Sequence, residues 1–126
     1  MINNELIGEY TDLRVNSGIL IVTHKVSEIT LEMAHIIVDE RLEFVDGKSY
    51  PILIKDRGVA KVDKKARDYF NTDKSLQDIS ACAMLTSSIF KMTLANFFLK
   101  VSRQPFPVKM FREEEEAVNW LKQYVA

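Results

Sequence analysis

Charged residues are frequent between Lys55 and Asp68 of this 126-residue chain. Three residues of the segment are acidic (Asp56, Asp63, Asp68) and six are basic: Lys55, Arg57, Lys61, Lys64, Lys65 and Arg67. Because Asp63 can cap a short helix, Lys64 and Lys65 fall in its first turn, where free N–H groups and the positive dipole end attract anions. We therefore predict that Arg57, Lys61, Lys64 and Lys65 bind a phosphate or a lipid headgroup. The alternative is a solvated basic face screened by salt.

The two histidines, His24 and His35, lack the companions that metal binding or acid–base catalysis requires. No cysteine or paired carboxylate accompanies either of them at ligand spacing. His35 falls beside Leu31 and Val38 on a predicted helix, so we expect it at the edge of the core with a hydrogen-bond partner. A metal ligand or a general base is the alternative interpretation. We expect no metal and no cofactor.

Nucleophile motifs are also missing from the sequence. It contains no G-x-S-x-G elbow, no phosphate-binding P-loop and no G-x-G-x-x-G fingerprint. The single cysteine, Cys82, lies in an apolar stretch, which indicates a buried structural thiol. Ser87 and Ser88 follow a strand and favour helix capping, with phosphate binding or modification as the alternative. We expect no catalytic residues; the alternative is a small enzyme using His35 or the Lys64/Lys65 turn.

An acidic run, Glu113 to Glu116, stands before the last apolar stripe of the chain. Carboxylates stabilise the positive end of a helix dipole, so the run is typical of a helix start. A metal or partner patch is the alternative. We expect Trp120 to anchor this helix through its large amphipathic ring.

The segment from Ser88 to Val101 predicts a helix that is apolar on more than one side. One stripe consists of Phe90, Leu94, Phe97 and Val101. Met92 and Leu99 lie on the far side, and Phe98 lies on its flank. A neighbouring helix of the chain could cover this surplus, or it could line an apolar groove or form a dimer seam. We predict a homodimer, with Met92, Phe98 and Leu99 at the interface or groove.

The spacing of apolar residues along the chain predicts an α/β fold that positions these residues. This spacing predicts a hairpin over 9–15 and 19–22, helices over 31–45, 63–70, 88–101 and 113–124, and strands over 51–54, 79–85 and 108–111. Thr30 is suited to cap the start of the helix over 31–45, and Gly47 is suited to follow its end. The resulting order is β-β-α-β-α-β-α-β-α. We therefore expect a mixed sheet with an N-terminal hairpin and about four helices.

The composition is that of one globular domain over residues 1–126, with 47% hydrophobic and 28% charged residues. The net charge of −1 gives no global field for nucleic acid, which we do not expect as a partner. No segment is long and apolar enough to span a membrane. Because the first eight residues hold polar Asn3, Asn4 and Glu5, we expect no signal peptide and a cytoplasmic location.

The element order and several motifs resemble the SpoIIAA-like branch of the STAS fold, as found in small bacterial proteins of unassigned function. The chain ends in Pro-Phe-Pro-Val-Lys-Met-Phe over 105–111 and Glu-Ala-Val-Asn-Trp-Leu over 116–121, close to the pattern of that branch. The stretches 65–70 (Lys-Ala-Arg-Asp-Tyr-Phe) and 94–99 (Leu-Ala-Asn-Phe-Phe-Leu) also match. Anti-sigma-factor antagonists of this fold carry a phosphorylated serine where this chain has Lys64 and Lys65. A phosphorylation switch of that kind cannot operate with lysines.

The resemblance implies a non-catalytic regulatory or binding module. Its ligand would be a protein partner or an apolar or anionic small molecule, and the distant similarity of STAS domains to Sec14-type domains makes a lipid-like ligand reasonable. Together with the apolar surplus of the third predicted helix, it favours a self-associating module.

Overall fold

The computed structural model describes residues 4–56, 61–101 and 105–126 of the chain. A six-stranded mixed sheet has the strand order β1-β2-β3-β5-β7-β8. Its strands are β1 (Glu5–Ile7), β2 (Thr11–Asn16), β3 (Ile19–His24), β5 (Tyr50–Asp56), β7 (Ile79–Leu85) and β8 (Val108–Phe111). The first three strands are antiparallel, and β3, β5, β7 and β8 are parallel. A small parallel pair, β4 (Glu28–Ile29) and β6 (Lys61–Val62), lies apart from this sheet.

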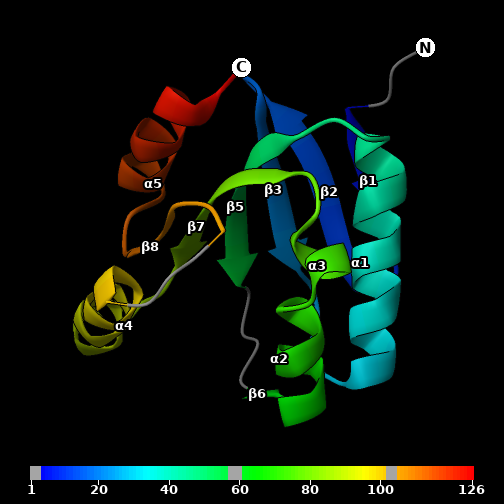
Figure 1. Ribbon diagram of the computed structural model, residues 1–126, viewed down its shortest axis with the longest axis horizontal. Helices are drawn as coiled ribbons and strands as arrows, with labels where there is room; N and C mark the ends of the chain where they lie inside the picture. The colour runs from blue at the N-terminus through cyan, green and yellow to red at the C-terminus, as the bar shows by residue number, and fades with distance from the viewer. Residues whose placement is uncertain (1–3, 57–60, 102–104) are drawn as a thin grey trace.

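Helices connect the parallel strands and follow the last of them. They are α1 (Leu31–Val45), α2 (Lys64–Phe70), α3 (Asp73–Leu76), α4 (Ile89–Val101), α5 (Glu114–Leu121) and a final 3-10 turn, η1 (Lys122–Tyr124). Figure 1 shows α1 on one side of the sheet and α5 on the other, with α4 beyond the end that carries β8. The predicted α/β order is therefore confirmed.

Alternating side chains of the central strands build a core on each face of the sheet. On one face Leu20, Ile52 and Cys82 pack with Val45 of α1. On the other face Leu53, Ala81 and Ala83 pack with Ala117 and Leu121 of α5. The small side chains of β7 let α5 approach the sheet closely. The strand predicted over 79–85 is thus covered on both faces, as its small and apolar residues indicate.

Several local predictions are confirmed at residue level. The Thr30 hydroxyl accepts the Met33 N–H (3.4 Å) and caps α1. The Ser88 hydroxyl accepts the Lys91 N–H (3.1 Å) and caps α4. The chain leaves α1 through Asp46 and Gly47, both with positive φ (49° and 80°), so the left-handed conformation begins one residue before the predicted glycine.

The fold contains elements that the apolar periods did not predict. Strand β1 extends the predicted hairpin into a three-stranded antiparallel unit. Strands β4 and β6 have two residues each, and α3 has four. Elements this short show no periodic apolar pattern that could predict them. Asp63 precedes α2 as predicted but makes no side-chain capping hydrogen bond.

Helix α1 carries a buried arginine whose burial the apolar pattern of this helix did not predict. Arg41 is only 6% exposed. Its Nη1 donates to the Gln77 carbonyl oxygen (2.9 Å), and its Nη2 donates to the Ser75 carbonyl oxygen. Burial lowers the pKa of the Arg41 guanidinium, and the charge of Asp78 offsets part of this shift. Arg41 therefore ties α1 to the chain that leaves α3 and enters β7.

Candidate functional site

The predicted anion site lies where β6 enters α2, and its cations have carboxylate neighbours. Lys64 Nζ lies 3.0 Å from Asp68 Oδ2, one helical turn further along α2. Lys61 Nζ lies 3.9 Å from Glu28 Oε1 in the adjacent strand β4. Lys65 is exposed, and Arg57 lies outside the described residues. Each exposed pair contributes little stability but reduces the positive potential available to a ligand. The anion site stays a prediction.

His35 does not lie where the helix pattern placed it. Its imidazole is exposed and packs on the Tyr69 ring of α2, with ring centroids 4.0 Å apart. The expected position at the core edge is wrong because the side chain is exposed, and among the described residues it contacts the Tyr69 ring in place of a hydrogen-bond partner. No group of three His, Cys, Asp or Glu side chains that could hold a metal occurs among the described residues.

The serines after β7 act as helix caps. Thr86 Oγ1 accepts the Ser88 N–H (3.4 Å), and Ser88 in turn caps α4. Ser87 is exposed. Capping by Ser88 is therefore confirmed, whereas modification of Ser87 or Ser88 stays a prediction.

The acidic run begins α5, as predicted. Glu114, Glu115 and Glu116 occupy its first turn, and Glu114 Oε1 lies 2.8 Å from Lys55 Nζ on β5. The indole of Trp120 packs between Phe111 (5.6 Å between ring centroids) and Tyr124 (5.2 Å). These contacts hold the last helix on the sheet, so the interpretation of Trp120 as an anchor is confirmed.

Helix α4 borders the sheet instead of covering the centre of a face. Its main packing partner is β8, the last strand of the sheet. All of its residues except Lys91, Thr93, Asn96 and Lys100 are apolar. Ile89 is 58% exposed, and Met92 and Leu99 are half-buried. The side chain of Phe98 lies outside the described residues. Apolar surface therefore reaches solvent along this helix.

Asn96 attaches α4 to the edge strand. Its Nδ2 donates to the Met110 carbonyl oxygen (3.0 Å), and its Oδ1 accepts the Met110 N–H (2.8 Å). The side-chain amide thus pairs with β8 as a neighbouring strand would. This arrangement protects the edge from another chain.

We expect Asn96→Ala to lower the free energy of unfolding by about 2 kcal/mol, because it leaves both backbone groups of Met110 without these partners. Urea denaturation measures the loss, and hydrogen exchange at the Met110 amide should accelerate. Asn119→Ala, an exposed position of α5, is the control and should change stability by less than about 0.5 kcal/mol. Equal stability of the two variants would contradict the role given to Asn96.

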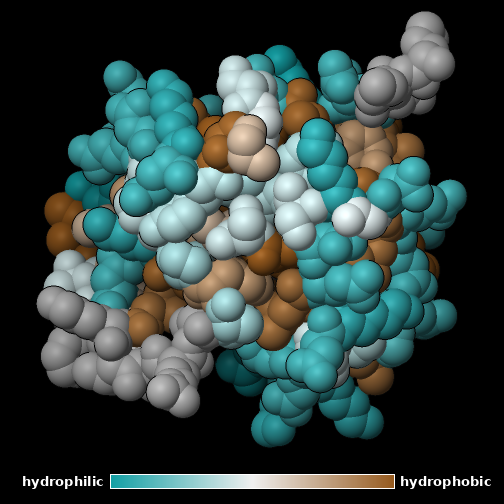
Figure 2. All heavy atoms as spheres, turned by 45° about the horizontal axis from the view of Figure 1, so that its top comes forward, coloured by the Kyte–Doolittle hydropathy of each residue, from teal (hydrophilic) through white to brown (hydrophobic). Residues whose placement is uncertain are grey.

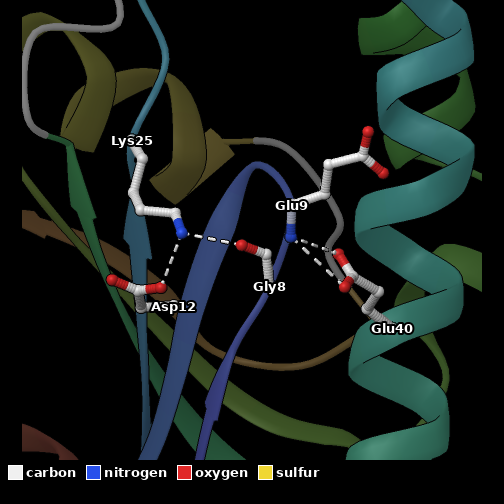
Figure 3. Close-up of polar contacts among 5 residues, drawn as sticks. All are labelled: Gly8, Glu9, Asp12, Lys25 and Glu40. Atoms are coloured by element: carbon white, nitrogen blue, oxygen red, sulfur yellow. Dashed lines mark hydrogen bonds and ion pairs between the residues drawn. The ribbon is translucent and has the colours of Figure 1, made fainter.

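A second region, at the opposite edge of the sheet, was not predicted from the sequence. Figure 3 shows how side chains fix the turn between β1 and β2. Lys25 Nζ donates to the Gly8 carbonyl oxygen (2.7 Å) and lies 2.9 Å from Asp12 Oδ1. On the other side of the turn, both carboxylate oxygens of Glu40 lie 3.3 Å from the Glu9 nitrogen and accept its N–H. Residues distant in sequence therefore hold β1 against α1.

Between β1 and α1 the surface is hollowed. A shallow depression of about 320 Å³ is lined by Leu6, Glu40, Glu43 and Phe44. A neighbouring one shares Glu43 and Phe44 and reaches Asp46, Lys48 and Tyr50. In Figure 2, brown surface emerges at the upper right among teal side chains, over the end of the molecule where β1 and the last turn of α1 lie. Exposure alternates along Glu5, Leu6 and Ile7 in the structure, but their polarity does not, and three residues are too few for a pattern that predicts a strand.

The architecture defines the class of fold. It is similar to the crystal structure of an uncharacterized protein of the DUF3478 family, which has a SpoIIAA-like fold and comes from Shewanella loihica PV-4. The TM-score is 0.59 at 16% sequence identity, with 96% of this chain and 99% of that chain covered. The chain therefore has the SpoIIAA-like fold that its motifs predict.

The family follows from the sequence match. The model described as Domain of unknown function (DUF7793) matches residues 13–125, and the chain belongs to this family. No curated protein matches the chain. Within the described ranges, every helix is too short or too polar to cross a bilayer.

Proposed function

We propose that this protein is a non-catalytic binding module that pairs with a second copy of itself through α4. The observation that carries this proposal is the position of α4, a 13-residue helix that is apolar except at four positions and packs mainly on the last strand of the sheet. Removing apolar area from water favours association. A monomer would leave that surface in water.

The side chains on α4 favour a second copy as the occupant. Of its described positions, Lys91 and Thr93 are exposed and polar, whereas Ile89 is exposed and apolar. Lys91 is the one charged side chain among the described positions of α4, which gives a foreign partner few groups there for electrostatic selection. A two-fold axis beside α4 would instead place one apolar stripe against an identical one, as in most homodimers.

The placement of the reactive groups supports a role without catalysis. Lys64 is engaged by Asp68, and His35 lies on an aromatic ring at the surface. Cys82 is 4% exposed, and burial raises the pKa of its thiol to about 12, so it stays protonated at neutral pH. These groups lie on different elements, and they do not form the nucleophile, base and orienting group that covalent catalysis needs.

Sedimentation velocity at about 5–100 μM tests the pairing. We expect a dimer for the unaltered chain and at least a tenfold weaker association for Ile89→Glu. A carboxylate at the first residue of α4 suits the helix dipole, so this variant should fold normally. Ile7→Glu is the matched control, since Ile7 is also an exposed isoleucine (75%, against 58% for Ile89) and lies outside α4; it should dimerise like the unaltered chain.

A monomer at 100 μM would contradict the proposal, as would equal dimerisation by both variants. Native mass spectrometry of freshly purified protein provides a second readout of subunit number. It also detects a co-purified small molecule, which would support the lipid-like ligand predicted from the sequence in place of a protein partner.

A further inference from the structure

The two outer strands of the sheet differ in how their free edges are covered. Strand β8 is paired by the Asn96 amide and flanked by α4. At the other end, β1 pairs only with β2 among the described strands. An edge strand without cover offers its backbone groups to another extended chain.

The hydrogen bonds at the two ends of β1 identify which of its backbone groups are open. The Asn4 carbonyl accepts the Val15 N–H (2.8 Å), and the Gly8 N–H donates to the Thr11 carbonyl (2.9 Å), so even-numbered residues face β2. Backbone direction alternates along an antiparallel strand, and the N–H and C=O groups of Glu5 and Ile7 therefore face outward. The next outward N–H, that of Glu9, is already bound by the Glu40 carboxylate.

The surface beside this edge selects the side chains of an incoming strand. Leu6 and Phe44 form the apolar floor of the depression, and Glu40 and Glu43 stand at its rim. Asp46 adds a third carboxylate at the end of α1, and Lys48 is the one cation among the described lining residues. On the other face of β1, Ile7 is 75% exposed. The rim is thus acidic, although the whole chain has a net charge of only −1.

We infer that the β1 edge binds a basic, extended peptide segment of a partner protein as an additional strand. Backbone pairing with Glu5 and Ile7 supplies affinity, and pockets for alternate side chains supply specificity. Residues at i, i+2 and i+4 of the segment face α1, so the pattern is basic, apolar, basic, with the central side chain on Leu6 and Phe44. The residues between them pack on the face of Ile7.

Charge decides between this occupant and a second copy of the chain. Two copies paired through β1 would bring two acidic rims together, because Glu40, Glu43 and Asp46 lie on the same side of each sheet. Like charges at an interface oppose association, whereas lysine or arginine side chains are attracted. This edge is separate from α4, so the inference does not depend on the proposed homodimer.

The test uses the peptide Lys-Val-Leu-Val-Lys, blocked at both ends, titrated into the isotope-labelled full chain. We expect binding in the range of about 10–500 μM, with the largest NMR shifts and increased hydrogen-exchange protection at the Glu5 and Ile7 amides. The charge-reversed peptide Glu-Val-Leu-Val-Glu should bind at least tenfold more weakly. A peptide with proline at the second valine, which lacks one N–H donor, should also bind at least tenfold more weakly.

Variants of the protein locate the site. Glu43 is exposed, so Glu43→Lys should fold normally and weaken binding about tenfold. Glu115→Lys on α5 makes the same change in net charge and should leave affinity unaltered. Absence of binding at 1 mM peptide would overturn the inference, and so would equal binding by the two variants or shifts centred on α4. A dimer that persists in Ile89→Glu but is lost in Ile7→Pro would also overturn it, in favour of a second copy at β1.

Discussion

Arg41→Ala should lower the free energy of unfolding by about 3 kcal/mol and the melting temperature by about 10 °C. The guanidinium of Arg41 is the partner of two carbonyl oxygens, those of Ser75 and Gln77, at a position only 6% exposed. Truncation leaves the buried Ser75 oxygen and the partly buried Gln77 oxygen without that donor, and it removes packing beneath α1. Hydrogen bonds to charged groups are stronger than neutral ones, and losing them in the interior is costly.

Three further variants separate the causes of that loss. Arg41→Met keeps most of the packing but donates nothing, so it should remain at least about 1.5 kcal/mol less stable than the unaltered chain. Arg41→Lys keeps the charge but lacks the forked guanidinium that reaches two carbonyls. Its stability should lie between that of Arg41→Ala and that of the unaltered chain. Arg67→Ala, on the exposed side of α2, should change stability by less than about 0.5 kcal/mol. Urea denaturation measures all four, and full stability of Arg41→Met would refute the hydrogen-bonding role.

Cys82 should react with a thiol reagent at pH 8 at least about 10³-fold more slowly in the native protein than in urea. Burial raises the pKa of this thiol from 9.0 to about 12, while the charge of Arg41 acts weakly in the opposite direction. At pH 8 the reactive thiolate is therefore about a thousandfold rarer in the folded state. Its position under α1, among Leu20 and Ile52, also excludes the reagent.

The same shift gives stability a definite dependence on pH. The unfolded chain loses the Cys82 proton near pH 9, whereas the folded chain retains it to about pH 12. The contribution of Cys82 to stability is present below pH 9 and is lost as the pH rises between these values. Cys82→Ala should show a smaller decline in stability between pH 8.5 and 10.5 than the unaltered chain. Rapid labelling of the native thiol at pH 8 would show that the face covered by α1 opens readily.

The two edges of the sheet give the binding proposals a common structural basis. At β8, a side-chain amide and an apolar helix replace a neighbouring strand, and the helix leaves apolar surface for a second copy. At β1, backbone groups of Glu5 and Ile7 remain open beside an acidic depression. A dimer through α4 would hold its two β1 edges apart, and one assembly could then bind two extended segments.

Local pattern was sufficient for the elements whose period is long enough to recognise. The apolar stripe of α1, its Thr30 cap, the small buried residues of β7 and the acidic first turn of α5 all occur as predicted. Each depends on interactions within a few residues, such as capping, helix dipoles and alternation between faces. The resemblance carried by the 105–121 segment likewise identified the SpoIIAA-like fold.

Contacts between distant residues decided the rest. The sequence pattern gives no reason for a polar residue such as Arg41 to be buried. Its burial is favourable only because the carbonyls of Ser75 and Gln77 accept its hydrogen bonds. His35 became a partner of Tyr69 because α2 packs beside α1. The open β1 edge exists because a three-residue strand is held in place by Glu40 and Lys25, through pairings that no local pattern records. Periodicity determines which face of an element is buried, whereas tertiary packing determines what that face meets and which edges stay open.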